Sequence, residues 1–81
     1  MELKRGQVVR SKAGRDQGGF LAVLEPGPGW VLVCDGKERP LERPKRKNRR
    51  HLALTDMRVP EECLGSNRKL RAALGKTRRA T

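Results

Sequence analysis

Residues 20–35 constrain the fold most, because two short apolar runs are separated there by Pro-Gly-Pro-Gly. The runs FLAVLE (20–25) and WVLVCD (30–35) have the composition of β-strands. Residues 26–29 cannot continue a strand or a helix, since proline lacks the backbone N–H and glycine is flexible. We therefore expect two strands joined by a turn. The second is apolar throughout, which predicts that both of its faces are packed or that one is packed and the other partly covered.

Three further segments predict strands, at residues 7–11, 38–42 and 50–55. Asp35-Gly36 is the strongest hairpin signal in the chain and leads into 38–42, where Pro40 fits only an edge strand or a bulge. In 50–55, Leu52 and Leu54 share one face. Five short strands joined by tight turns indicate a mostly β domain, as a small antiparallel barrel or a sandwich.

The C-terminal part has a different character. Ser66 or Asn67 can cap a helix over residues 66–74 that ends at Gly75, with Leu70 and Leu74 on one face. We expect a compact domain over 1–55. Residues 56–81 then form a loosely attached basic extension, as a short helix or a flexible tail.

The charge balance points to a polyanionic partner. Twenty Lys and Arg residues stand against nine Asp and Glu residues, a formal net charge of +11. Repulsion among these positive charges destabilises a small compact chain. It therefore favours a nucleic acid as partner and, less strongly, an anionic membrane. With no apolar leader, no long apolar run and no lipidation motif, we expect a cytoplasmic protein without membrane contact.

Cys34 and Cys63 are then expected to be reduced. Cys34 is predicted to be a buried residue of its strand, and Cys63 has no assigned role.

Two segments carry the candidate binding residues. The first, residues 10–20, combines Arg10, Lys12 and Arg15 with Gly14 and Gly18. Its glycines permit positive φ and close approach, so its N–H groups and cations could cradle an anion. The glycines and cations could equally serve the turn alone.

The second segment, residues 43–50, holds six cations in eight positions without an acid. It is flanked by predicted strands, which favours phosphate contact over a solvated loop.

The remaining chemistry is sparse. Phe20 and Trp30 are the only aromatic residues, with Phe20 facing the core and Trp30 either in the core or exposed as a stacking platform. Few rings favour recognition of folded RNA by shape and phosphate. The single His51 has no nucleophile or carboxylate pair beside it, and the two cysteines and one histidine have no metal-site spacing. We expect neither enzymatic activity nor a cofactor.

Residues 6–24, GQVVRSKAGRDQGGFLAVL, resemble a KOW motif, with Gly14, Arg15, Asp16 and Gly18 matching its loop. The similarity continues through WVLVCDGKERPLERPKRKNRRHL and covers about residues 2–55. The chain as a whole resembles short bacterial KOW-domain RNA-binding proteins, which are related to archaeal and eukaryotic large-subunit ribosomal proteins. The resemblance implies an SH3-like five-stranded antiparallel barrel that binds structured, often ribosomal RNA. Gln17 departs from the motif, which usually has Lys there.

The charge pattern predicts an RNA-binding protein without a small-molecule substrate, expected to be a monomer, and the resemblance implies association with the ribosome and the translation machinery. The alternative is an SH3-like protein-interaction module of the transcription or translation machinery. A DNA-binding protein is a weaker third reading. The predicted RNA-binding residues are Arg10, Lys12, Gly14, Arg15, Lys37, Arg39, Lys45, Arg46, Lys47, Arg49 and Arg50.

Overall fold

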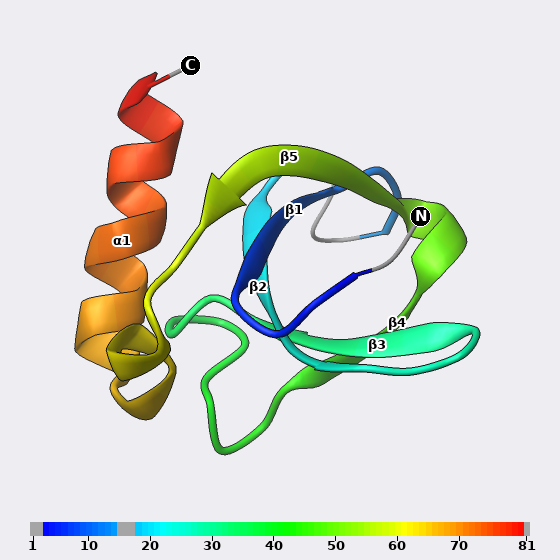
Figure 1. Cartoon of the computed structure of the whole chain (residues 1–81), viewed down its shortest axis with the longest axis horizontal. Helices are drawn as coiled ribbons and strands as arrows, with labels where there is room; N and C mark the ends of the chain where they lie inside the picture. Colours follow the sequence, from blue (N-terminus) through cyan, green and yellow to red (C-terminus); the bar gives the residue numbers. More distant parts are fainter. Residues whose placement is uncertain (1–2, 15–17, 81) are drawn as a thin grey trace.

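The computed structural model describes residues 3–14 and 18–80, with side chains up to Lys76. Its main feature is a curved five-stranded sheet, with a C-terminal helix at one side (Figure 1). The strand order is β4-β3-β2-β1-β5, and all neighbouring strands are antiparallel. The elements in chain order are β1 (Gln7–Ser11), β2 (Phe20–Pro26), β3 (Trp30–Cys34), β4 (Lys45–Asn48), η1 (Arg49–His51), β5 (Leu52–Arg58), η2 (Glu61–Gly65) and α1 (Asn67–Ala80). A mostly β fold with five strands is confirmed.

Both faces of the central strands are buried, as the unbroken apolar runs predicted. One hydrophobic cluster lies in the concavity of the sheet and consists of Val9, Leu21, Val23, Val31, Val33 and Leu52. The other lies on the opposite face and includes Val8, Ala22 and Cys34. Because successive side chains of a strand alternate between faces, Val8 and Val9 contribute to different clusters.

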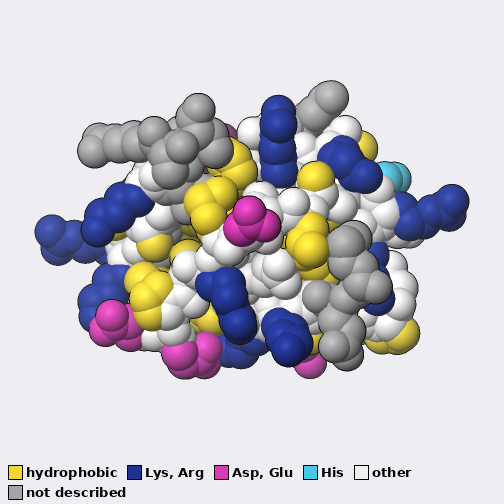
Figure 2. Space-filling model, turned by 45° about the horizontal axis from the view of Figure 1, so that its top comes forward, with side chains coloured by type: hydrophobic (Ala, Val, Ile, Leu, Met, Phe, Trp, Pro, Cys, Tyr) yellow, Lys and Arg dark blue, Asp and Glu magenta, His cyan; other side chains and the backbone are white. Residues whose placement is uncertain are grey.

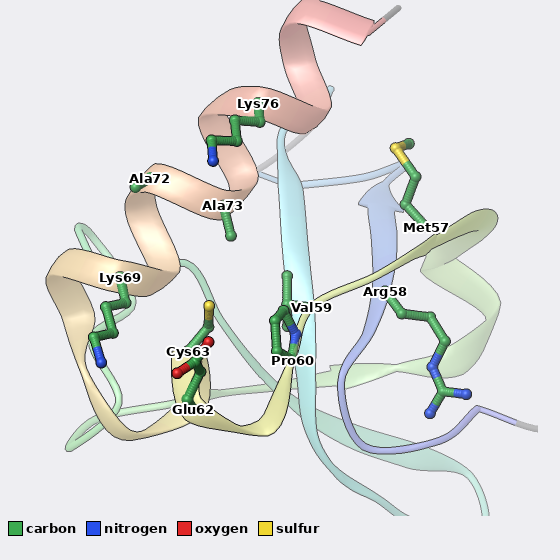
Figure 3. A pocket seen from close by; sticks show the side chains of 10 residues that line it. All are labelled: Met57, Arg58, Val59, Pro60, Glu62, Cys63, Lys69, Ala72, Ala73 and Lys76. Atoms are coloured by element: carbon green, nitrogen blue, oxygen red, sulfur yellow. The ribbon is translucent and has the colours of Figure 1, made fainter.

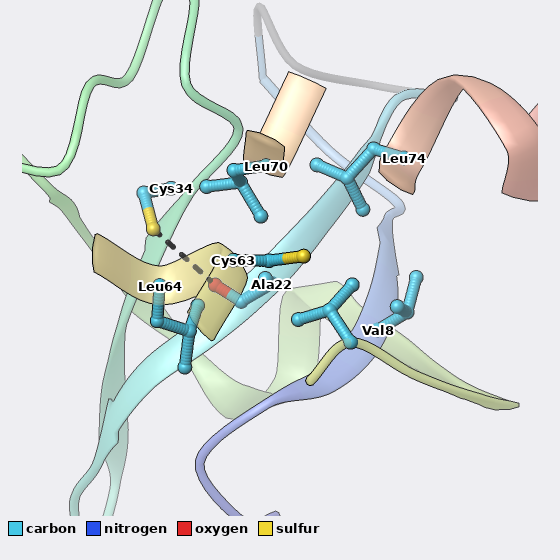
Figure 4. Packing of buried hydrophobic residues seen from close by; sticks show 8 residues of the cluster. Val8, Ala22, Cys34, Cys63, Leu64, Leu70 and Leu74 are labelled. Carbon is cyan, nitrogen blue, oxygen red and sulfur yellow. Dashed lines mark hydrogen bonds between the residues drawn. The ribbon is translucent and has the colours of Figure 1, made fainter. Parts of the chain in front are cut away.

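The helix α1 belongs to this second cluster, so the expected loose attachment of the C-terminal segment is wrong. Leu70 is fully buried and Leu74 is 4% exposed, and both pack with Val8 and Ala22 (Figure 4). Ser66 caps the helix through the Lys69 N–H, as predicted. The helix continues past Gly75, which lies in helical backbone and was expected to end it. This packing supplies stability that a short isolated helix lacks.

The fourth strand is not at residues 38–42, and that prediction is wrong. Asp35 Oδ1 accepts hydrogen bonds from the N–H groups of both Lys37 and Arg39, at 2.8 and 2.9 Å. The Leu41 N–H donates to Asn67 Oδ1 at 2.8 Å. Because these backbone N–H groups are bonded elsewhere, the segment has few donors left to pair with a neighbouring strand. The strand that pairs with β3 is instead β4, within the basic run.

The last strand differs from its predicted bounds, and the structure shows where both cysteines lie. β5 begins two residues later than predicted and runs to Arg58, across the expected domain boundary at residue 55. Leu52 is buried, but Leu54 is 40% exposed. Cys34 is buried as predicted, and Cys63 is buried in the same cluster. Both thiols are free, and the Cys34 thiol lies 3.9 Å from the Ala22 carbonyl oxygen (Figure 4).

Across residues 3–14 and 18–80, no helix is long and apolar enough to cross a membrane.

Candidate nucleic-acid interface

The glycine-rich connection between β1 and β2 is held at both ends by backbone hydrogen bonds. The Ser11 N–H donates to the Gly19 carbonyl at 2.9 Å, and the Gly18 N–H donates to the Ser11 carbonyl at 2.8 Å. Gly14 has φ +78° and Gly18 has φ +84°, so both use the freedom that the sequence predicted for them. Predicted site residue Arg15 and motif residues Asp16 and Gln17 lie outside the described residues.

Lys47 joins this connection to β4. Its side chain is only 8% exposed, and its ammonium donates to Ser11 Oγ at 2.7 Å and to the Ala13 carbonyl at 3.0 Å. The Ser11 hydroxyl itself donates to the Ala13 carbonyl at 3.0 Å. The sequence predicted that Lys47 contacts phosphate. The structure instead directs its charge into the protein, beneath the connection that carries Gly14.

The neighbours of Lys47 on β4 remain available at the surface. Lys45 and Arg46 are exposed. The Arg46 guanidinium carbon lies 4.3 Å from the centre of the Trp30 ring, within cation–π distance. Trp30 itself is half-buried, and its ring packs so closely on Gly27 that a Cβ there would lie 2.9 Å from two ring atoms. Trp30 therefore supports Arg46 and packs against its own turn.

A surface groove of about 540 Å³ lies where these segments meet. It is lined by Ala13, Gly14, Arg39, Lys45, Arg46, Lys47, Asn48 and His51. Five of the predicted site residues thus come together from three separate parts of the sequence. Among the described residues that line the groove, none is acidic. An anionic ligand would meet cations there without a repelling carboxylate.

The other predicted residues that the structure describes do not line this groove. Lys37 lines a smaller hollow beside α1, and Arg49 lines one beside residues 26–28. Arg10, Lys12 and Arg50 are exposed, with the Lys12 N–H bonded to the His51 carbonyl at 2.8 Å. Lys and Arg side chains are spread over the face shown in Figure 2 and do not form one patch. Charge alone therefore does not locate the site.

Sequence reasoning missed three parts of this arrangement: Ser11, Asn48 and His51. Ser11 is 1% exposed and bonds the Lys47 ammonium, while Asn48 and His51 line the groove. The available signal for Ser11 was its place two residues after Val9, on the same face of the predicted strand. Asn48 caps η1 through the Arg50 N–H at 2.9 Å, which places His51 at the groove.

A second groove, of about 650 Å³, lies between the end of β5 and α1 (Figure 3). Its lining is mainly apolar and includes Met57, Val59, Pro60 and Ala73. Arg58, Lys69, Lys76 and Glu62 also line it. The sequence did not predict this groove.

Within residues 3–14 and 18–80, no three His, Cys, Asp or Glu residues are grouped so that they could hold a metal ion. No protein-family model and no curated protein sequence matches this chain.

Proposed function

We propose that this protein binds structured RNA without catalysing a reaction, through the groove between the β1–β2 connection and β4. One observation carries the proposal: a glycine-rich connection and a basic run, 30 residues apart in sequence, line one groove whose described residues include no acid. Each segment alone has an ordinary structural explanation. Their convergence on one hollow favours a common anionic ligand.

The groove residues have two different roles, direct contact with phosphate and positioning of the backbone. Lys45 and Arg46 are exposed and would contact phosphate directly, and Arg39 lines the same hollow. Lys47 would act through position, since its ammonium fixes Ser11 and Ala13 and so the backbone around Gly14. Phosphate contacts of this kind determine orientation and affinity but do not read sequence.

Structured RNA fits better than single strands. Proteins that bind single strands expose several rings for stacking. Here the one tryptophan is half-buried and packs against Gly27 and Arg46. Recognition by shape and phosphate suits double-helical or folded RNA. The KOW resemblance adds ribosomal RNA as the specific candidate and a cytoplasmic, ribosome-associated monomer as the setting. The two free cysteines agree with a reducing compartment.

We also propose that the curved sheet closes as an SH3-like barrel. The terminal strands of the order, β4 and β5, are joined by only the three residues of η1. The Arg49 N–H donates to the Gly29 carbonyl at 3.4 Å, and the His51 carbonyl accepts from Lys12. These bonds tie η1 to the β2–β3 turn and to the end of β1, which supports closure of the sheet at this end.

The salt dependence of RNA affinity tests the proposal. Contacts to about five phosphates give a slope of about −3.5 to −4.5 for log affinity against log salt. We expect that slope for the wild-type protein with an RNA stem-loop of about 16 base pairs. The double variant Lys45→Gln/Arg46→Gln should bind more weakly with a shallower slope. A wild-type slope near −1, or unchanged binding by the variant, would overturn the proposal.

The second groove supports an alternative function as a protein-interaction module. Its apolar lining with three cations and one acid suits an acidic segment that carries a hydrophobic side chain. Under this alternative, substitution of Met57 and Ala73 by Asp would abolish partner binding, and Lys45→Gln/Arg46→Gln would leave it intact.

A further inference from the structure

A second basic hollow lies between the turn after β3 and α1, separate from the groove at β4, which is called the RNA groove below. It is lined by Phe20, Asp35, Lys37, Arg71, Leu74 and Gly75. Lys37 and Arg71 are exposed and come from segments 34 residues apart in sequence. With Asp35 included, the charges of the lining side chains sum to +1. Asp35 is occupied in the turn, since its Oδ1 accepts from two backbone N–H groups.

The turn connects the two hollows. Lys37 lines the hollow beside α1, and Arg39, two residues later, lines the RNA groove. The turn is closed by the Asp35 N–H, which donates to the Arg39 carbonyl at 2.9 Å. A ligand that follows the surface from Lys45 past Arg39 therefore reaches Lys37 and then the flank of α1 that carries Arg71.

The position of α1 against this turn is fixed by contacts at the start of the helix. Gly36 has φ +79°, and a Cβ there would overlap the Asn67 carbonyl oxygen. The Asn67 side chain accepts from the Leu41 N–H at 2.8 Å and donates to Glu42 Oε1 at 2.7 Å. Leu70 and Leu74 anchor the next turns in the core. Arg71 is thus held on a rigid element, which favours binding because little further ordering is needed.

The two flanks of α1 differ. Lys69 and Lys76 line the apolar groove beside β5 (Figure 3). Arg71 lies on another flank, where it lines the hollow together with Lys37. At 100° per residue, Arg71 is separated from Lys69 and Lys76 by well over a quarter of a turn. The helix therefore offers cations to two different surfaces.

We propose that Lys37 and Arg71 form a second phosphate-binding site, so that α1 is part of the RNA interface. This inference rests on the proposed RNA binding and extends it from the groove at β4 to the C-terminal helix. The RNA contacts the groove and this flank together, and the opposite flank of α1 takes no part.

Matched charge removals on the two flanks test the inference. Affinity for the same RNA stem-loop is measured over a range of salt concentrations for Lys37→Gln/Arg71→Gln and for Lys69→Gln/Lys76→Gln. Each pair removes two positive charges from exposed positions, and such surface changes usually leave stability within about 0.5 kcal/mol. We expect the first pair to bind more weakly, with a slope shallower by about 1.8, since each lost phosphate contact contributes about 0.9. The second pair should keep the wild-type slope.

Equal effects of the two pairs would overturn the inference, because the positive charges would then act without regard to their position. A wild-type slope in the Lys37→Gln/Arg71→Gln variant would also overturn it. Lys45→Gln/Arg46→Gln, measured alongside, separates the two proposals. If that variant weakens binding and Lys37→Gln/Arg71→Gln does not, only the second site fails. If the wild-type slope is near −1, RNA binding through phosphate fails and the second site fails with it.

Discussion

At the scale of single residues, Lys47 changes how the basic run is understood. Six cations in eight positions suggested a uniform surface, yet this one lysine is buried and bonded to Ser11 and Ala13. A buried ammonium is stable only where hydrogen bonds satisfy it. The hydrogen bonds to Ser11 and Ala13 therefore offset the cost of burying this ammonium, and they hold the connection around Gly14 in place.

Replacing Lys47 by Met keeps most of the side-chain stem and removes the charge. The Ser11 hydroxyl and the Ala13 carbonyl both lose the ammonium, and hydrogen bonds to a charged group contribute about 1.5–3 kcal/mol. We expect a lower free energy of unfolding in urea. We also expect faster hydrogen exchange at the Gly18 amide, which is bonded to Ser11. The matched variant Lys45→Met, at an exposed position, should change neither; equal effects of the two would contradict the positioning role.

Gly14 tests whether the connection itself binds. At φ +78° a β-branched residue is strained by about 1–3 kcal/mol, although the nearest atom to a Cβ would be Lys47 Nζ at 3.9 Å. Gly14→Val should therefore reduce RNA affinity by distorting the backbone and not by steric overlap. Gly14→Asn should retain more of the affinity, because Asn tolerates positive φ better. Wild-type binding by Gly14→Val would show that the connection is not part of the interface.

The Cys34 thiol gives a pH dependence. Burial, aided by the Asp35 carboxylate, raises the pKa of the Cys34 thiol from about 9 to about 11. The folded state then holds this proton more tightly than the unfolded chain. Its contribution to stability is complete below pH 9 and is lost as the pH rises toward 11. The difference in unfolding free energy between wild type and Cys34→Ala should shrink over that range; a constant difference would contradict the raised pKa.

At the scale of elements, the sequence predicted β1, β2 and β3 well because each of these apolar segments directly follows a glycine. It missed β4, because Lys45–Asn48 has the composition of a loop and only Lys47 faces inward. Side-chain bonds from Asp35 and Asn67 removed residues 38–42 from the sheet, and such long-range partners leave no local signal. Only part of the binding site could be predicted from the sequence, for the same reason. The two basic segments were visible in the sequence, whereas their meeting at one groove depends on the pairing of β4 with β3.

The helix α1 is the element whose packing differs most from expectation, and Leu70 tests it. Leu70 is fully buried in the cluster with Val8 and Ala22. Leu70→Ala should lower the unfolding free energy by about 2–5 kcal/mol. The same change at Leu54, which is 40% exposed, should cost much less. Both are measured by urea denaturation, and a similar small cost at the two positions would mean that α1 is only loosely attached.

At the scale of the whole molecule, a net charge of +11 is carried by a body whose largest extent is 28 Å. Repulsion within so small a volume opposes folding, and a polyanion relieves it. Since the cations are spread over the surface, long-range attraction would bring RNA to many faces. The groove and the Lys37–Arg71 hollow are then the places where shape and charge together fix the bound orientation.

Cross-linking of the tagged protein to RNA in cells, with sequencing of the RNA and mapping of the cross-linked peptides, tests the central claim most directly. The account predicts recovery of one site in large-subunit ribosomal RNA. The cross-links should fall on peptides that contain Gly14, Lys45 or Arg46. Scattered or absent RNA signal, together with a defined protein partner in the same purification, would contradict it.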